Sequence, residues 1–422
     1  MGLNLLCLTF SEILKYGFYL LIALLVLLVM ITIHEFGHFI VGKKLGFKIN
    51  EFAVGFGKIL WKKTTKDGIL ITLRLIPLGG FCAFEGEDGE SQVEGSFNSM
   101  APWKRLLVLF SGAFFNFLSA IIMSFILLLS LGYADLVEIK SIDSRASETN
   151  LVELNEKDVV YEVGGIETNF VYDNYFNTLI ANYAPGENID LKVKRDGEFQ
   201  NITIQNGRVL QVVGGSESTK IYEINQGLNF SVKFGESVEV FDSTNAKLEL
   251  TEKQINEKKY YYFVLNGQSY VIDAENQVAY TGYLGVKLQN YKYSFGEALL
   301  YCVPFSFEWA WKVLMILWQL ITGQIGLDGL GGPITTISSI ASYTQTSWLN
   351  LLVLFPLISI NLAVFNWLPF PALDGARMLF VIIEWIRKKP INRNVEGYIH
   401  AGGLILLFAF VIIIDILHLL LF

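Results

Sequence analysis

The residues in this sequence that are best suited to chemistry are His34, Glu35 and His38, which form an HExxH pattern. In a helix, residues four positions apart lie on one face, so both imidazoles could bind the same metal ion. The adjacent carboxylate could take a proton from a metal-bound water, since zinc lowers the pKa of such a water from roughly 15.7 to about 7. The pattern therefore predicts metal-assisted hydrolysis.

The surroundings of this pattern strengthen the prediction. An uncharged apolar run extends over residues 16–33 and leads directly into His34. A charged side chain within a bilayer costs about 2.5 kcal/mol or more. The alternative, a chance pentapeptide on a surface helix, does not account for that cost, so we interpret the pattern as a functional site.

A catalytic zinc ion usually takes three protein ligands and leaves the fourth position to water. The predicted third ligand is Asp374, which follows Pro369 and Pro371, because a helix broken at membrane depth is tolerated where it lines a cavity. Two alternatives remain: Asp374 is solvated at an ordinary span end, or His400 is the ligand. The last histidine, His418, lies among leucines and is interpreted as interfacial.

The composition is that of a membrane protein. Of the 422 residues, 52% are hydrophobic and 17% are charged, against about 25% charged in soluble domains; the mean hydropathy is +0.44. A net charge of −8 argues against binding to nucleic acid. The cysteines, Cys7, Cys82 and Cys302, lie far apart and form neither a disulfide framework nor a CxxC metal site.

Four uncharged stretches approach or exceed the roughly 20 residues that cross a bilayer. We expect transmembrane helices at residues 16–33, 106–133, 348–373 and 398–414. A weaker stretch, residues 313–327, is interpreted as an interfacial amphipathic helix. The first stretch is not expected to be a cleaved signal peptide, because no small-residue cleavage site follows it.

The distribution of Lys and Arg predicts the orientation of these helices. Residues 42–105 and 375–397 are rich in basic residues and are expected to be cytoplasmic. Residues 134–297 carry 15 basic and 25 acidic residues, so they are expected outside together with both termini. This orientation places His34, His38 and Asp374 at a similar depth, near the cytoplasmic face.

Residues 134–297 differ from the rest of the chain because they are polar and contain short alternating runs. Turn signals at Asp196-Gly197, Asn206-Gly207 and Asn266-Gly267 separate these runs. The pattern predicts a soluble β-rich module of one or two small domains.

Taken together, these features resemble the site-2 protease family of intramembrane zinc metalloproteases, in particular its bacterial members with an extracytoplasmic PDZ region. The family's second motif stands here as Asn366, Pro369, Pro371, Leu373, Asp374 and Gly375. Further likenesses are Phe56-Gly57 to Glu87-Asp88, Trp103-Lys104-Arg105 to Asn116-Phe117, and Gly331-Gly332-Pro333-Ile334. The resemblance covers roughly residues 16–135 and 280–422.

The resemblance implies that His34, His38 and Asp374 bind zinc and that Glu35 is the catalytic acid and base. It also implies a membrane-dipping β-hairpin within residues 69–83, whose edge would pair with an extended substrate. The candidate substrate-binding residues are Ile71, Leu73, Gly79, Gly80, Asn366, Pro369 and Pro371. The alternatives are a cytoplasmic hairpin without substrate contact and a purely structural Asn366.

The expected fold is an α-helical polytopic membrane protein with four transmembrane helices, a membrane-associated β-hairpin and an extracytoplasmic β-rich PDZ-like module. Residues 1–135 would hold the HExxH helix, the β segment and the second span; 136–207 a PDZ-like domain; 208–285 a divergent second PDZ-like domain or an inserted β-domain; 286–347 the interfacial helix and a Gly-Pro-Ile turn; and 348–422 the last two spans. In the PDZ-like region, Lys157 stands before Asp158 where the family usually has glycine.

The expected activity is zinc-dependent intramembrane cleavage of single-span proteins in a bacterial plasma (inner) membrane. Substrates would be membrane-tethered regulators such as anti-sigma factors, or remnant signal peptides, with an upstream site-1-type protease as a partner. The alternatives are a membrane-bound PDZ-type binding scaffold and a metal carrier or transporter. The complete ligand set with Glu35 argues against a scaffold, and four spans without an inverted repeat argue against a transporter.

Overall fold

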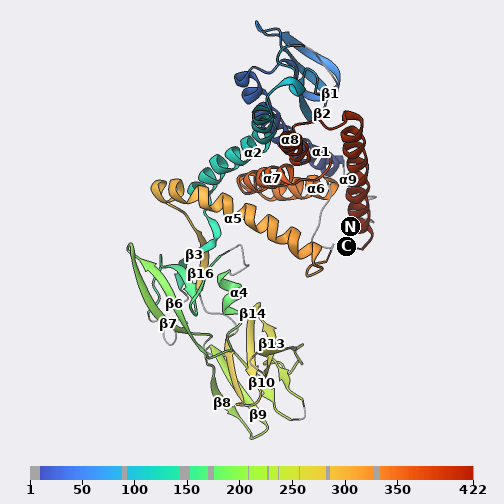
Figure 1. Cartoon of the computed structure of the whole chain (residues 1–422). Coiled ribbons are helices and arrows are strands. Elements are labelled where there is room, and N and C mark those ends of the chain that lie inside the picture. The colour runs from blue at the N-terminus through green and yellow to red at the C-terminus, as the bar shows by residue number, and fades with distance from the viewer. Residues whose placement is uncertain are drawn as a thin grey trace. The chain divides into compact units, whose positions relative to one another are not determined.

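The computed structural model describes residues 10–87, 93–142, 153–169, 175–207, 209–225, 228–235, 237–255, 257–281, 286–326 and 333–421. The chain divides into two compact units (Figure 1). The helical unit comprises Met1–Ser130 and Ser294–Phe422, and the β unit comprises Leu131–Tyr293. The predicted turn at Gly331-Gly332 lies outside the described residues.

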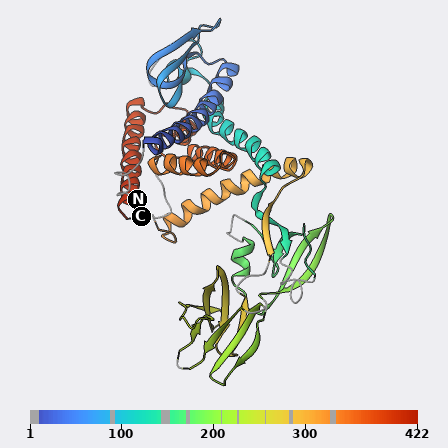
Figure 2. The same cartoon turned by 180° about the vertical axis from the view of Figure 1, so that it is seen from behind.

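The helical unit is built from seven described α-helices and one long β-hairpin (Figure 2). The helices are α1 (Phe10–Leu45), α2 (Pro102–Ser130), α5 (Phe295–Ile321), α6 (Pro333–Thr346), α7 (Asn350–Trp367), α8 (Asp374–Arg387) and α9 (Arg393–Leu421). Five of them, α1, α2, α5, α7 and α9, are long and apolar enough to cross a membrane, by length and composition.

The helix expected at residues 313–327 and the span expected at residues 348–373 have other bounds in the structure. The helix expected at residues 313–327 is α5, which begins at Phe295 and ends at Ile321. Ser294 and Glu297 form a capping box at its start. The charged residues Glu308 and Lys312 interrupt its apolar sequence, so the uncharged run is shorter than the helix. The span expected over residues 348–373 ends at Trp367, and a break separates it from α8.

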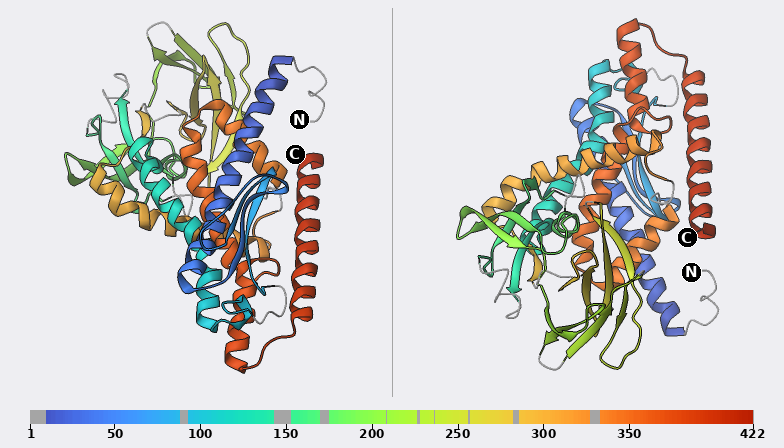
Figure 3. Two further views of the ribbon diagram at one scale, coloured as in Figure 1. Left: turned by 90° about the horizontal axis from the view of Figure 1, so that it is seen from above. Right: turned by 90° about the horizontal axis from the view of Figure 1, so that it is seen from below.

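Contacts along the helices show their relative directions. Near the start of α1, the ring of Phe18 lies 6.0 Å from the ring of Trp348, which is two residues before α7. At its other end, α7 stacks Trp367 on Phe110, near the start of α2, with centroids 5.1 Å apart. The imidazole of His38 also lies beside the start of α2. Thus α1 and α7 run in one direction and α2 in the other (Figure 3).

The hairpin of β1 (Ile49–Thr64) and β2 (Leu70–Phe84) coils into four paired segments. Residues 49–54 pair with 80–84 on one side and with 70–73 on the other, and 70–74 also pair with 59–64. The order across the sheet is therefore 80–84, 49–54, 70–74 and 59–64. Because residues 70–74 have β1 on both sides, their backbone is not an open edge, whereas residues 80–84 form an outer segment.

The first part of the β unit is a six-stranded sheet in the order β16-β3-β4-β6-β7, with β5 beside β4. A short helix, α4 (Phe176–Ile180), packs on its core. The strands are β3 (Tyr133–Ile142), β4 (Val159–Val163), β5 (Ile166–Glu167), β6 (Asn188–Arg195), β7 (Glu198–Gln205) and β16 (Val286–Tyr291). Lys157, at the position where glycine was expected, has a left-handed φ of 73°.

The second part of the β unit consists of two four-stranded antiparallel sheets, β11-β10-β9-β8 and β12-β13-β14-β15. The strands are β8 (Gln211–Gly215), β9 (Thr219–Asn225), β10 (Leu228–Lys233), β11 (Glu239–Phe241), β12 (Thr251–Ile255), β13 (Lys258–Leu265), β14 (Gln268–Asp273) and β15 (Val278–Thr281). One hydrophobic core joins both sheets, with Phe230 and Phe263 in edge-to-face contact.

Candidate metal centre

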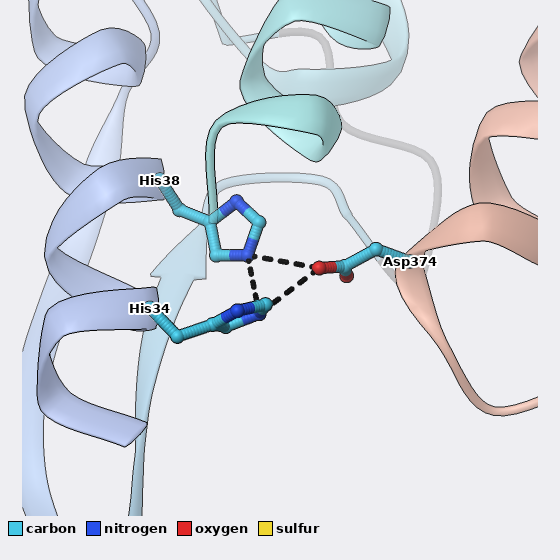
Figure 4. Close-up of side chains that lie close together, drawn as sticks. All are labelled: His34, His38 and Asp374. Carbon is cyan, nitrogen blue, oxygen red and sulfur yellow. Dashed lines mark hydrogen bonds and ion pairs between the residues drawn. The ribbon is translucent and has the colours of Figure 1, made fainter. Parts of the chain in front are cut away.

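His34 and His38 from α1 and Asp374 from the start of α8 meet in one cluster (Figure 4). The Nε2 atoms of the two histidines are 3.1 Å apart. The Oδ2 atom of Asp374 lies 3.0 Å from Nε2 of His34 and 3.2 Å from Nε2 of His38. The structure therefore brings together the three residues predicted as metal ligands, although Asp374 lies more than 330 positions from the two histidines in the sequence.

The size of this triangle fits a zinc ion. Ligand atoms held at tetrahedral angles about 2.0–2.1 Å from a common zinc would lie about 3.3 Å from one another. The observed separations of 3.0 to 3.2 Å are close to that value. Two imidazoles and a carboxylate are also a donor set used by catalytic zinc sites, which keep a fourth position open.

The orientation of His38 is fixed by the backbone of α2. Its Nδ1 lies 2.8 Å from the carbonyl oxygen of Val108, so Nδ1 carries the proton and donates it. The lone pair of Nε2 then points toward Asp374. A second hydrogen bond of this kind commonly fixes the tautomer of a metal-binding histidine. Within the described residues, Nδ1 of His34 has no such partner.

Close packing of α1 against α2 holds both histidines in place. A Cβ atom on Gly37 would lie 2.4 Å from the carbonyl oxygen of Ser111, and one on Gly112 would lie 2.3 Å from Nε2 of His38. Neither position accepts a side chain without moving the helices or the imidazoles. Sequence reasoning missed Gly112 and Val108, because only the packing of α2 reveals their role.

Asp374 reaches the cluster from a short loop between α7 and α8. The loop contains Ala372, whose φ of 82° is left-handed. Gly375 is required for the next turn, because a Cβ there would lie 2.1 Å from the carbonyl oxygen of Leu368. Asp374 is the first residue of α8, where the helix dipole stabilises a carboxylate.

The remaining candidates do not join the cluster. His400, the alternative ligand, accepts a hydrogen bond at Nδ1 from the backbone N–H of Ala372. The side-chain amide of Asn366 donates to the carbonyl oxygen of Leu362 one turn earlier in its own helix. Pro369 and Pro371 lie in the loop before Asp374, where they end α7.

A cavity of about 420 Å³ surrounds the three predicted ligands and Glu35. The outer segment of the coiled hairpin, from Phe81 to Phe84, forms one of its walls. Glu35 and Cys82 of that segment both line the cavity. Gly80 borders Glu35, whereas Ile71 and Leu73 lie in the inner segment and do not line this cavity.

The far end of α8 is anchored by buried charges. Glu384, which is 7% exposed, forms ion pairs with Arg105 of α2 and Arg393 of α9 and accepts the N–H of Ile391. Burial alone would raise the pKa of Glu384, but the hydrogen bonds from Arg105 and Ile391 outweigh it and hold the pKa below its usual range. Glu384 therefore stays charged and fixes the position of α8.

The fold and this site define a multi-pass membrane protein with a candidate HExxH metal centre. The model of peptidase family M50 matches residues 22–410, so the chain belongs to this family of zinc-dependent site-2 proteases. The zinc metalloprotease RasP of Oceanobacillus iheyensis is 25% identical, over 92% of this chain and 95% of that protein. The regulator of sigma E protease of Haemophilus influenzae is 24% identical, over 90% and 93%. A protein of Fusobacterium nucleatum is 26% identical, over 94% and 97%.

Proposed function

We propose that this chain is an intramembrane endopeptidase that cleaves single-span membrane proteins. The observation that carries the proposal is the convergence of His34, His38 and Asp374 beside Glu35, at the side of helices long and apolar enough to span a membrane. An ionisable cluster in such a setting is costly and marks a functional site.

The three ligands would hold a zinc ion, which would polarise the substrate carbonyl and lower the pKa of a bound water. Glu35 is placed to act as general base and then as general acid. It takes a proton from the attacking water and delivers that proton to the leaving amine. Glu35 lies beside the wall of the cavity that is formed by residues 81–84.

The same wall is the surface that we propose for substrate binding. A transmembrane helix must unwind before cleavage, because its carbonyl groups are hydrogen-bonded within the helix. An unwound segment can add to an open sheet edge through main-chain hydrogen bonds. Residues 80–84 supply that edge next to Glu35. Of the predicted contacts in the hairpin, Gly80 lies in this segment and Gly79 precedes it, whereas Ile71 and Leu73 support it from within the sheet.

The helix directions support four membrane crossings. Since α1 and α7 are parallel, the end of α2 and the start of α7 lie on the same side of the membrane. Between these two points the chain therefore crosses the membrane either not at all or an even number of times. If α5 crossed alone, α7 would be reversed; α6, at 14 residues, is about 21 Å long and too short for a core of about 30 Å. We infer that α5 lies along the membrane surface and that α1, α2, α7 and α9 cross it.

With this topology, the charge distribution supports a metal centre near the cytoplasmic face and a β unit that lies, with both termini, on the outer side. We infer that the six-stranded sheet is the PDZ-like domain. It then comprises the expected residues 136–207 together with the start of β3 and with β16, which was expected in the segment of the interfacial helix. The two four-stranded sheets that share one core favour an inserted β-domain for residues 208–285.

By analogy with the names of the relatives, we propose membrane-tethered regulators, cut first by a site-1-type protease, or remnant signal peptides as substrates.

The experiment is cleavage of tagged single-span reporters, anti-sigma-type and signal-peptide-type, in membranes containing the wild-type chain or Glu35→Gln. The proposal predicts a membrane-embedded cut with the wild type and a cut that is about 100- to 10,000-fold slower with the variant, the usual contribution of general acid–base catalysis. Equal cleavage by both would refute the role of Glu35. Wild-type zinc binding without cleavage of any reporter, in the presence of both classes, would favour a binding scaffold.

A further inference from the structure

A histidine outside the metal triad contacts the loop that carries one of the ligands. His400 lies on α9, and its Nδ1 accepts the backbone N–H of Ala372 at 3.0 Å. We propose that His400 is a positioning residue that holds this loop so that Asp374 can reach the metal. The inference rests on the proposed zinc site and assigns a role to a residue that does not bind the ion.

The backbone at Ala372 needs such support. Its φ of 82° lies in the left-handed region, which costs a residue with a side chain about 1–3 kcal/mol. Strain of this size persists only where the surrounding structure compensates for it. The hydrogen bond to His400 is formed by the strained residue itself, two positions before Asp374.

The packing of α9 reinforces this contact. A Cβ atom on Gly403 would lie 2.1 Å from Cβ of Pro371, so the helix backbone rests directly on the loop. The neighbouring Gly402 has nothing within 4 Å of the same hypothetical atom. Thus α9 touches Pro371 through Gly403 and Ala372 through His400, while Asp374 turns from these contacts toward His34 and His38.

The chemistry of the contact specifies the side chain. A backbone N–H donates only to a nitrogen with a free lone pair, so Nδ1 of His400 accepts and the ring proton is on Nε2. Phenylalanine keeps a ring beside Phe380, whose centroid is 5.4 Å from that of His400, but has no acceptor. Asparagine has a side-chain oxygen that can accept in place of Nδ1.

The test measures zinc affinity of the full-length chain in detergent, by competition with a chelator, at a pH that keeps histidine neutral. We expect His400→Phe to weaken zinc binding about 10- to 100-fold, the usual effect of losing an orienting group behind a ligand. His400→Asn should recover most of this loss. Ala372→Gly should rescue His400→Phe, because glycine adopts a positive φ without strain. His418→Phe, on the same helix, is the control and should bind zinc normally.

The glycine pair provides a second comparison that leaves His400 intact. Gly403→Ala should weaken zinc binding by pushing Pro371 away, and Gly402→Ala should not. Unchanged zinc affinity in His400→Phe would overturn the proposal. The proposal would also be overturned if His400→Phe lost zinc binding as completely as Asp374→Ala, and if neither His400→Asn nor the added Ala372→Gly restored it. His400 would then be a ligand. A wild-type chain that binds zinc no better than His34→Ala would instead refute the metal site.

Discussion

The two sides of the metal centre are held in different ways. His34 and His38 sit on one continuous helix, and the backbone of α2 packs against them through Gly112 and the carbonyl of Val108. Asp374 stands at the end of a strained loop and depends on polar contacts from other helices. The histidine side is thus positioned chiefly by close packing of two helices. The aspartate side combines hydrogen bonds and ion pairs with the contact of Gly403 on Pro371.

This difference indicates which side can adjust. A helix that is packed at van der Waals distance against another has little freedom, because protein interiors are as dense as organic crystals. A loop held by a few hydrogen bonds can shift at lower cost. We expect substitutions at Gly112 on the histidine side to act through steric displacement, and those at His400 and Glu384 on the aspartate side to act through loss of polar contacts.

The largest effect on the aspartate side is expected from Glu384→Ala. This change leaves the buried guanidinium of Arg105 without its carboxylate partner, and breaking a buried pair typically costs about 3–5 kcal/mol. The free energy of unfolding, measured by denaturant titration in detergent, should fall by that amount, and zinc should be retained less well. The control is Glu396→Ala, which removes another partner of Arg393 and should cost less than about 1 kcal/mol.

On the histidine side, Gly112→Ala should disturb the site with little loss of polar contact. The new methyl group would overlap His38, and a displacement of about 1 Å in an active site can reduce the rate about 100-fold. Reporter cleavage and zinc content should both fall. Gly17→Ala is the control, because a Cβ atom there has nothing within 4 Å, and it should leave cleavage and zinc content unchanged. If Gly112→Ala behaved like Gly17→Ala, the close contact of α1 and α2 at Gly112 would not be needed for the site.

The pH dependence of the melting temperature should report on the ion pairs of Glu384, on the aspartate side of the metal centre. The pKa of Glu384 is held below its usual value of 4.5, so this group stabilises the fold above that value. Its contribution is lost as the pH falls below 4.5 toward the pKa in the folded state. Melting temperatures measured between pH 7 and pH 3 should therefore fall more steeply for the wild type than for Glu384→Gln, and parallel curves would contradict the assignment.

The smallest effect is expected at a left-handed residue far in sequence from the metal ligands, which serves as a reference for Ala372. Lys157 has a φ of 73° in a turn before β4, where the family resemblance led us to expect glycine. Lys157→Gly should stabilise the β unit by about 1 kcal/mol, since a left-handed L-residue costs roughly 1–2 kcal/mol. The unfolding midpoint of the β unit should rise while zinc affinity stays the same; a lower midpoint would show that the lysine side chain stabilises the turn.

The sequence was sufficient for the residues whose relation is local. His34 and His38 follow from helical spacing, and Asp374 was recognised because prolines interrupt an apolar run before it. Turn signals also located two hairpins, where Asp196 and Asn266 have the positive φ values that such turns require.

Features that depend on packing between distant segments were not predicted. Alternation in Ile71 and Leu73 indicates a strand but does not reveal that β1 pairs with it on both sides. Nothing in the sequence around Gly112 indicates that its missing side chain makes room for two imidazoles. His400 was considered as a ligand because its residue type is suited to metal binding, whereas its place in the structure is behind the ligand loop.

The metal content of the purified chain and its single-alanine variants shows whether His34, His38 and Asp374 form one zinc site. We expect one zinc ion per wild-type chain, none in His34→Ala, His38→Ala or Asp374→Ala, and zinc retained by His400→Asn. Full zinc content in Asp374→Ala, with loss in His400→Asn, would refute this site and identify His400 as the third ligand.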